Sequence, residues 1–408
     1  MDETLAIHGG PPVRKRPFPD WPVFGEREET YVLEALRSGK WGGSGQVKRA
    51  GFQAKLPEWE RRFAQLQGAK YGVSVVNGTM AITVALQAAG VKPGDEVIIP
   101  PYTFIASASA ALLFGAVPVF ADVKAETMQL DPEQVKRAIT PRTRAVLTVH
   151  LGGGMGDMTR LKQVADSHGL ALIEDAAQAI GARWDGIGAG AWGDAGTFSF
   201  QSSKNLTAGE GGIVLTSDPE LMERAWSVAN VGRVLGGEWY QHERIGWNLR
   251  MTEFQAAILL AQLDRLEEQL ARRHRNAMLL DRLLGEVEGV RFVHRDPRNR
   301  HGWHLYLFRL ADRVTKRVSK AEWVRMVQAE GIPVSPGYFA LNKHPAVMRS
   351  IRDWTGEHRA YPCPAAERLA EREAVWLGQQ VLLDTEAGME EVARAITKVN
   401  RYVLAARS

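Results

Sequence analysis

Cysteine and long hydrophobic runs are the two main absences from this sequence of 408 residues. The one cysteine, Cys363, excludes a disulfide within the chain, which fits a reducing compartment. No apolar run approaches the ~18 residues needed to cross a bilayer. The N-terminal stretch MDETLAIHGGPPVRKRPFPD also lacks the apolar core of a signal peptide. We therefore expect a cytoplasmic protein without a membrane segment.

A strong excess of charge of one sign is lacking as well. The chain has 51 basic and 47 acidic residues, a net charge of +4, and no basic block with interleaved aromatic residues. Its cysteine and histidine residues do not have the spacing of a zinc site. We therefore expect neither a nucleic-acid partner nor a metal ion. Hydrophobic residues make up 45% of the chain, which is long enough for about two or three domains.

Short apolar runs alternate with helical patterns from Tyr71 onward. This alternation predicts an α/β fold with a mostly parallel sheet that helices cover on both faces. In such sheets ligands bind at the carboxyl ends of the strands, next to helix N-termini. The expected strands are Gly72–Val76, Glu96–Ile99, Val117–Ala121, Ala145–His150, Ala171–Glu174, Thr197–Phe200 and Gly212–Thr216.

The pattern along the chain divides it into three parts. Residues 1–25, rich in Pro, Gly and Arg, are expected to form a surface arm. Residues 26–265 contain the predicted sheet and form the large domain. One long helical pattern, Thr252–Leu284, leads into residues 266–408, which mix strands, helices and proline-rich turns. We expect this last part to be a smaller α+β domain.

Two of the expected strands end in residues suited to a flat ligand that carries a phosphate. Gly78 and Thr79 follow the first strand and open a helix, where backbone N–H groups suit a phosphate. A plain helix N-cap has the same pattern. Phe104 follows the next strand and can lie flat against a planar ligand, although such a residue often belongs to the core.

Charged side chains follow two further strands. Asp175 directly follows a buried apolar run, where a protonated ring nitrogen or a core ion pair would stabilise the carboxylate. Gln178 is placed to donate to a ring oxygen. Lys204 lies between a buried strand and a glycine-rich turn. Lost hydration lowers a lysine's pKa there and lets the neutral amine form a Schiff base with an aldehyde. Taken alone, a lysine at the end of a strand is far more often an ordinary surface residue.

One ligand explains these signals together. A phosphate turn, a flat aromatic ring, an acid and a lysine at the ends of strands form a pocket for pyridoxal 5′-phosphate. Lys204 would hold the aldehyde of this cofactor. Asp175 would keep the ring nitrogen protonated, which makes the ring an electron sink.

Five stretches resemble a known family: NGTMAI, IIPPYTFIAS, IEDAAQAIGA, GTFSFQSSKNLTAGEGG and GWNLRMTEFQAAI. They are similar to the DegT-type sugar aminotransferases, of fold type I among the pyridoxal phosphate enzymes, and the likeness runs from about Phe18 to near the C-terminus. The resemblance implies that Lys204 is the Schiff-base lysine and that Asp175 faces the pyridine nitrogen. It also implies the other cofactor contacts: Gln178 to the ring hydroxyl, Phe104 to the ring face, and Gly78, Thr79, Ser199 and the neighbouring subunit's Asn248 to the phosphate.

The contribution of Asn248 to a neighbouring subunit implies a homodimer in which each chain completes the other's pocket. Within the family, FPDWPVFGEREE and VWLGQQVLL are most similar to two groups. One is the scyllo-inosose type of keto-cyclitol aminotransferase, and the other is the 3-amino-5-hydroxybenzoate synthases. The synthases carry histidine in place of Gln178 and glycine in place of Ser203, so this chain follows the aminotransferases at both positions. Residues 150–157, HLGGGMGD, depart from the pattern, because most relatives have fewer glycines there; the acceptor ketone stays open.

The implied reaction is a ping-pong transamination. Glutamine or glutamate gives an amino group to a ketone on a cyclic polyol, in the biosynthesis of amino sugars, aminocyclitols or related natural products, and Lys204 moves the proton. The alternative is an aromatising dehydratase or lyase of the hydroxybenzoate synthase type. The sugar dehydratases of the family replace the lysine with histidine, so Lys204 argues against them. A non-catalytic regulator would usually carry a DNA-binding domain, and no such segment is visible.

Five residues are candidates for substrate contacts, each with local packing as the alternative. Arg250 is a candidate for the donor carboxylate, and a structural ion pair fits it equally well. The glycine-rich residues 42–51 are placed to close over the substrate and exclude water. The remaining candidates lie in glycine- or proline-rich loops or at a strand end: Trp41, His150, Tyr338 and His344.

Overall fold

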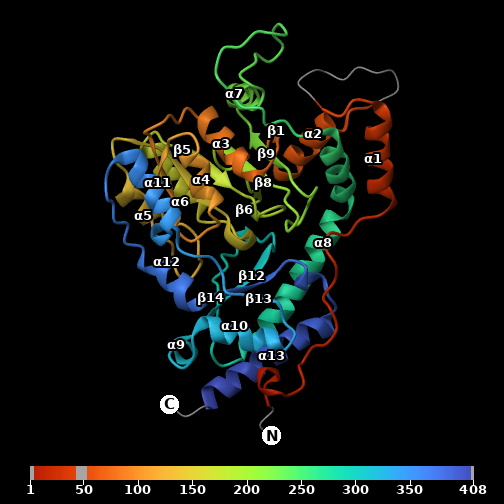
Figure 1. Ribbon diagram of the computed structural model, residues 1–408, viewed down its shortest axis with the longest axis vertical. Helices are drawn as coiled ribbons and strands as arrows, with labels where there is room; N and C mark the ends of the chain where they lie inside the picture. The colour runs from red at the N-terminus through yellow and green to blue at the C-terminus, as the bar shows by residue number, and fades with distance from the viewer. Residues whose placement is uncertain (1–3, 43–52, 406–408) are drawn as a thin grey trace.

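The computed structural model describes residues 4–42 and 53–405 (Figure 1). Its centre is a seven-stranded sheet in the order β1-β9-β8-β5-β4-β2-β3. Within this sheet β9 runs antiparallel to both of its neighbours and the other strands run parallel, so the mostly parallel sheet predicted from the sequence is confirmed. The strands are β1 (Tyr71–Val75), β2 (Glu96–Ile99), β3 (Val117–Phe120), β4 (Thr143–Val149), β5 (Ala171–Asp175), β8 (Ala195–Ser199) and β9 (Gly212–Thr216).

Both faces of this sheet are buried, because alternate strand residues enter two different hydrophobic cores. Val97 and Leu147 belong to one core, and their neighbours Ile98 and Val146 belong to the other. The first core is closed by α3 (Gly78–Ala88), α4 (Ala106–Leu112), α7 (Pro219–Ala229), α11 (Pro345–Thr355) and α12 (Pro364–Arg368). The second is closed by α2 (Lys55–Gln67), α5 (Pro132–Ala138), α6 (Met158–Ser167) and the first half of α8 (Glu253–Gly285).

A second, four-stranded sheet has the order β10-β12-β14-β13 and a core of its own. The long helix α8 runs from the large sheet to this smaller one (Figure 1). The predicted domain boundary at residues 265 and 266 falls inside α8, and the division into an arm and two domains stays a prediction. The elements here are β10 (Val290–Phe292), β12 (Leu305–Leu310), β13 (Val334–Ser335), β14 (Ala374–Gly378), α9 (Asp312–Thr315), α10 (Lys320–Ala329) and α13 (Glu386–Ala405).

Smaller elements complete the chain. A three-stranded sheet joins β11 (Asn299–Arg300), β6 (Arg183–Trp184) and β7 (Ile187–Gly188), and α1 (Glu26–Ser38) packs on α8. Among the described helices, none is both long and apolar enough to cross a membrane.

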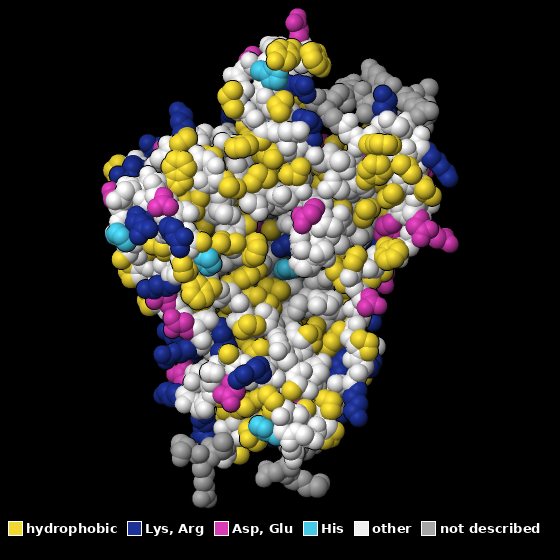
Figure 2. Space-filling view, in the orientation of Figure 1, with side chains coloured by type: hydrophobic (Ala, Val, Ile, Leu, Met, Phe, Trp, Pro, Cys, Tyr) yellow, Lys and Arg dark blue, Asp and Glu magenta, His cyan; other side chains and the backbone are white. Residues whose placement is uncertain are grey.

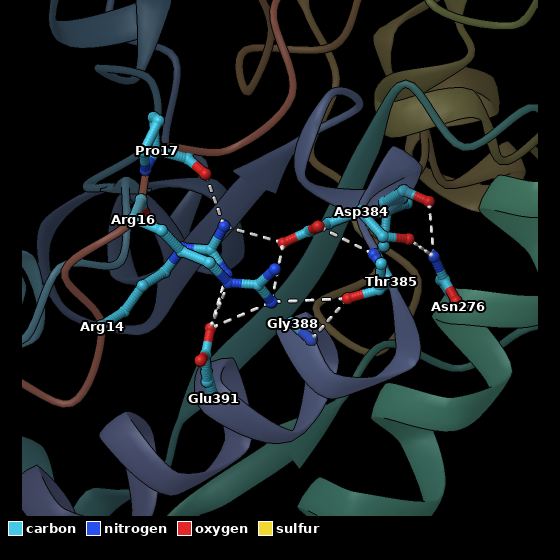
Figure 3. Close-up of polar contacts among 9 residues, drawn as sticks. Arg14, Arg16, Pro17, Asn276, Asp384, Thr385, Gly388 and Glu391 are labelled. Atoms are coloured by element: carbon cyan, nitrogen blue, oxygen red, sulfur yellow. Dashed lines mark hydrogen bonds and ion pairs between the residues drawn. The ribbon is translucent and has the colours of Figure 1, made fainter.

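The N-terminal segment is tied to α13 by a buried arginine (Figure 3). Arg14 forms ion pairs with Asp384 at 2.8 Å and with Glu391 at 2.6 Å, and it donates to the backbone oxygen of Pro17. The Arg14 side chain is fully buried, whereas that of Arg16, which also approaches Glu391, is 46% exposed. Because a buried charge is stable only when it is paired, Arg14 fixes the path of this segment.

Candidate active site

Gly78 and Ser199 meet at the carboxyl edge of the large sheet, where β1 and β8 end. A Cβ atom on Gly78 would lie 2.6 Å from the Cβ of Ser199, so the start of α3 approaches Ser199 this closely only because residue 78 is glycine. Asn77 caps α3 by accepting from Met80 N at 2.9 Å. The first N–H groups of a helix, here those of Gly78 and Thr79, lack intrahelical acceptors and bind anions. This cradle has the chemistry of a phosphate site.

Asp175 ends β5 and is buried beside β8. Its Oδ2 accepts a 2.7 Å hydrogen bond from Ser107 Oγ, and its Oδ1 accepts from Ala177 N at 3.2 Å. Thr103 Oγ1 lies 3.1 Å from Ser107 Oγ. These two donors fix the orientation of the Asp175 carboxyl group, which is suited to pair with a cation such as a protonated ring nitrogen.

Lys204 lies in the turn after β8, where its backbone N–H bonds to Gln201 O at 2.9 Å. Desolvation lowers the pKa of Lys204 to about 8, although the nearby Asp175 carboxylate opposes this shift. About a tenth of such amines are neutral at pH 7. The structure therefore places a reactive amine and an anion together, as the sequence predicts.

Gln178 and Tyr338 form the side of the pocket next to Asp175. Gln178 Oε1 accepts from Gly152 N at 2.7 Å, and its Nε2 donates to Tyr338 Oη at 2.8 Å. Burial raises the pKa of Tyr338 to about 12, so its hydroxyl keeps its proton. The ring of Phe104 lies 6.1 Å from that of Tyr338 and is 55% exposed, which leaves it accessible to a planar ligand. The structure thus brings Phe104, Asp175, Gln178 and Tyr338 together.

His150 is not in this pocket. Its side chain is fully buried, and its Nε2 lies 2.7 Å from Glu174 Oε2. Glu174 also accepts from three backbone N–H groups, of residues 190, 192 and 193. Successive strand residues point to opposite faces of a sheet, so Glu174 and its partner lie on the face opposite Asp175. The substrate contact predicted for His150 is therefore corrected: this histidine is a structural partner of Glu174.

Arg250 lies beside the end of β1, bridged to Val75. Desolvation and the like charge of Arg233 lower its pKa. Its buried Nη1 has no hydrogen-bond partner among residues 4–42 and 53–405, as expected for a group that binds an anion. Asn248 is exposed and bridges to Asn230.

Trp41 and His344 are not among the residues that contact Asp175 or Gln178 in the interactions given above. Trp41 packs its ring 5.9 Å from that of Phe254 and donates its indole N–H to Leu36 O. His344 precedes α11 and makes an edge contact with Phe339 at 5.9 Å. Most of the glycine-rich stretch predicted to close over the substrate, residues 43–51, is outside the described residues.

Three buried residues near Lys204 and Asp175 were missed by sequence reasoning. Ser107 holds Asp175, and its signal was its position at the start of a helix after a strand end. His304 lies close enough that the charge of Lys204, after desolvation, lowers its pKa well below the usual value. Its Nδ1 lies 3.1 Å from Asn205 Oδ1, and Asn205 donates to Gly302 O at 2.8 Å. No motif marks His304, because it precedes an ordinary apolar strand.

The side chains present fit pyridoxal phosphate. The Gly78–Ser199 cradle suits an anion, Asp175 offers a carboxyl group for a ring nitrogen, Lys204 supplies an amine of lowered pKa, and Phe104 offers an accessible ring.

Comparisons with known proteins agree with this pocket. The model of the DegT/DnrJ/EryC1/StrS aminotransferase family matches residues 23–397. The L-glutamine:2-deoxy-scyllo-inosose aminotransferase of Streptomyces kanamyceticus is 39% identical over 428 residues, with 100% of this chain and 99% of the relative covered. The 3-amino-5-hydroxybenzoate synthase of Amycolatopsis mediterranei (strain S699) is 39% identical over 388 residues, covering 94% and 97%. A crystal structure of 3-amino-5-hydroxybenzoic acid synthase matches with a TM-score of 0.85 at 36% identity, covering 95% and 99%.

The fold and the pocket define an enzyme of fold type I that depends on pyridoxal 5′-phosphate. The chain belongs to the DegT/DnrJ/EryC1/StrS aminotransferase family. The fold class, the cofactor and the family predicted from the sequence are thereby confirmed, and the individual roles of the site residues stay predictions.

Proposed function

We propose that this aminotransferase moves the amino group of glutamine to a ketone on a cyclic polyol of the keto-cyclitol class. The support is the joint presence of the Lys204–Asp175 pocket and of full-length relatives named for glutamine and a scyllo-inosose. The reaction then has two half-reactions in the same pocket, because the donor and the acceptor react in turn beside Lys204. We further infer a cytoplasmic location, which a chain with one free cysteine fits.

When bound, pyridoxal phosphate supplies the aldehyde that carries the amino group and a ring that withdraws electrons. Lys204 Nζ would take the proton from the donor's α-carbon and deliver it to the cofactor carbon that receives the amino group. In the second half-reaction it would move a proton from that carbon to the acceptor's carbon, and its lowered pKa suits this role near neutral pH. Asp175 would hold a proton on the ring nitrogen, and Ser107 keeps that carboxyl group oriented. Tyr338 accepts a hydrogen bond from the Gln178 amide, which would hold that amide in place to contact the ring hydroxyl.

We propose that Arg250 takes the donor carboxylate or the phosphate, since its buried Nη1 has no partner in the described part of the chain. We further propose that the enzyme is a homodimer with shared pockets. The segment between α7 and α8 projects from the molecule (Figure 1), and hydrophobic side chains lie on the surface of this projection (Figure 2). Two of its large side chains are exposed, Trp239 at 78% and Ile245 at 98%. Exposed apolar side chains on a projecting segment favour a protein interface. The exposed Asn248 at its base is then placed to enter the other subunit's pocket.

The second candidate is an aromatising reaction of the 3-amino-5-hydroxybenzoate synthase type. The relative and the solved structure of that name match this chain about as well as the aminotransferases do. Gln178 and Ser203, where the synthases are expected to carry histidine and glycine, favour transamination.

The two functions are separated by supplying glutamine or glutamate to the holoenzyme and following the cofactor's absorbance. Transamination predicts loss of the visible band with glutamine, followed by an aminated cyclic polyol in a mass-spectrometric screen of ketone acceptors. A band that no amino donor changes, with turnover of a cyclic dehydration substrate, would instead establish the synthase reaction. Borohydride treatment is expected to fix the cofactor's mass on Lys204, and labelling elsewhere would contradict its role.

A further inference from the structure

The turn that carries Lys204 is held on both sides by segments outside the large sheet. On one side, Trp21 of the N-terminal segment donates its indole N–H to Ser202 O at 3.0 Å. On the other side, Asn205 donates through Nδ2 to Gly302 O at 2.8 Å, in the segment that leads into β12. The backbone next to Lys204 is therefore attached both to the N-terminal segment and to the segment that enters the smaller sheet.

Asn205 has a second partner, His304, and both side chains are buried. Because Nδ2 of Asn205 donates to a carbonyl oxygen, its Oδ1 is the acceptor that lies 3.1 Å from His304 Nδ1. The proton of the neutral His304 ring is therefore on Nδ1, and Nε2 keeps its lone pair. The residue that follows Lys204 in the chain thus fixes one tautomer of His304.

The residue between these two contacts has a strained backbone. Trp303 has a φ of 52°, in the left-handed region that bulky side chains rarely adopt. Its side chain is buried, and its backbone N–H donates to His301 Nδ1 at 2.9 Å. In the chain it stands between Gly302 and His304, which both bond to Asn205. Such strain persists only where the surrounding structure maintains it, and it gathers at functional sites.

A buried arginine on α8 lies near residues on both sides of this turn. Arg273 is fully buried, and its Nε donates to Gln379 Oε1 at 3.0 Å. Its Nη1 has no hydrogen-bond partner within residues 4–42 and 53–405. Its guanidinium carbon lies 5.3 Å from the centre of the Trp21 ring. Because its acceptor is a neutral amide, this buried cation is poorly compensated, which indicates a role other than stability.

The charge of Arg273 acts on His304. Burial lowers the pKa of His304 well below its ordinary value, and the charges of Lys204 and Arg273 lower it further. The His304 ring therefore stays neutral near pH 7 and adds no positive charge beside the Lys204 amine.

Two stretches of the sequence meet at Arg273. Trp21 belongs to FPDWPVFGEREE and Gln379 to VWLGQQVLL, the stretches that resemble the keto-cyclitol aminotransferases and the hydroxybenzoate synthases. These two residues lie far apart in the chain, and both contact the same buried arginine. Both stretches are therefore connected to the Lys204 turn, directly through Trp21 and indirectly through Arg273 and His304.

We propose that His304 is a positioning residue for Lys204. By donating from Nδ1 to Asn205 Oδ1, it fixes the Asn205 side chain, and Asn205 fixes the backbone of the Lys204 turn through Gly302. The amine then keeps one direction while it moves a proton between the reacting carbons. The identity of Lys204 as the reacting amine rests on the proposed function, whereas the bracing of its turn does not.

The first test labels Lys204 with acetic anhydride in the full-length protein freed of cofactor, over a range of pH, and quantifies the labelled peptide against that of exposed Lys92 by mass spectrometry. In the parent, labelling is expected to be half-maximal near pH 8. His304→Leu removes the donor to Asn205, so water reaches the amine of the loosened turn. Labelling at pH 8 is then expected to fall about fivefold, as a rise of one unit in the pKa of Lys204 requires.

Two further variants separate positioning from a general loss of structure. His304→Asn keeps an N–H donor near the place of Nδ1 and is expected to label within about twofold of the parent. His168→Leu is the control, because this exposed histidine has its Nδ1 2.9 Å from Val164 O at the end of α6, and it should label as the parent does. If His304→Leu does not fold, Asn205→Ala, which removes the acceptor, takes its place with the same expectation.

The tautomer and the rate complete the test. NMR of protein with nitrogen-labelled histidine is expected to show a neutral His304 ring protonated on Nδ1 near neutral pH, assigned by its loss in His304→Leu. In the holoenzyme, the absorbance change with glutamine is expected to slow roughly tenfold in His304→Leu and to stay within about threefold in His304→Asn.

Three results would overturn the proposal: a charged or Nε2-protonated His304 ring, labelling in His304→Leu that equals or exceeds that of the parent, or equal losses in the leucine and asparagine variants. A parent protein that shows the expected labelling but no response to glutamine would count against the proposed function alone.

Discussion

Ser107 donates a 2.7 Å hydrogen bond to Oδ2 of Asp175, and both side chains are buried. Thr103, in the loop before α4, places its Oγ1 3.1 Å from Ser107 Oγ. Because this hydrogen bond restricts the rotation of the carboxyl group, Ser107 sets the orientation of Asp175. The acid proposed to face the cofactor's ring is therefore controlled from α4, an element that provides none of the predicted cofactor contacts.

Replacing Ser107 tests this control. Ser107→Ala leaves Asp175 Oδ2 without its donor, and we expect the half-reaction with glutamine to slow by roughly tenfold, equivalent to about 1.4 kcal/mol. Stopped-flow absorbance of the bound cofactor measures the rate. Ser107→Thr keeps a hydroxyl and is expected to stay within about threefold of the parent. Equal rates in the alanine and threonine variants would show that the hydrogen bond does not matter.

Closing the cradle at Gly78 tests the phosphate site. In Gly78→Ala the new methyl group lies 2.6 Å from the Cβ of Ser199, so either α3 or β8 must shift. We expect the affinity of the apoenzyme for pyridoxal phosphate to fall at least tenfold, measured by fluorescence titration. Gly285→Ala, where a Cβ meets nothing within 4 Å, is the control and should bind as the parent does. Normal affinity in Gly78→Ala would place the phosphate elsewhere.

The lowered pKa of Lys204 predicts how the apoenzyme's stability depends on pH. The folded pKa of about 8 lies below the unfolded value near 10.5, so the unfolded chain binds more protons between these pH values. The charged amine thus destabilises the fold below pH 8, and this penalty shrinks as the pH rises toward 10.5. We expect apo Lys204→Met to melt at a higher temperature than the parent at pH 7, with a smaller difference at pH 10. A difference that does not change with pH would mean that the amine is well solvated.

The buried arginine of the N-terminal segment should be important for stability. Arg14→Met leaves Asp384 and Glu391 without their buried partner, and we expect a loss of about 3 kcal/mol in the free energy of unfolding, measured with urea. Arg16→Met changes a neighbouring, half-exposed arginine and should cost less than about 1 kcal/mol. Losses of equal size would show that Arg14 acts only as a surface charge.

The sequence predicts the large sheet well, because its strands are buried on both faces and read as unbroken apolar runs. β2 and β9 have the predicted bounds, and the others differ by one or two residues at their ends. The strands of the smaller sheet are harder to predict from the sequence. β13 has only two residues, Val334 and Ser335, and exists because it pairs with β14, which no local pattern reveals.

Some residues of the candidate site could likewise be predicted from the sequence, and others could not. Lys204 and Asp175 could be identified because charges next to buried strands need a chemical reason. Ser107 and His304 have no local signal, since their importance comes from which side chain the fold brings beside them. His150 shows the opposite error, because its position at the end of a strand suggested a contact with substrate. Side chains alternate between the two faces of a sheet, and that of His150 lies on the other face, beside Glu174.

The long helix α8 has a mechanical consequence. Its 33 residues form one continuous rod of roughly 50 Å that is embedded in the cores of both sheets. A clamshell movement of the smaller sheet against the larger would have to bend this rod. Adjustment to different substrates therefore falls to loops and side chains at the mouth of the pocket, and the distance between the two halves is set in advance.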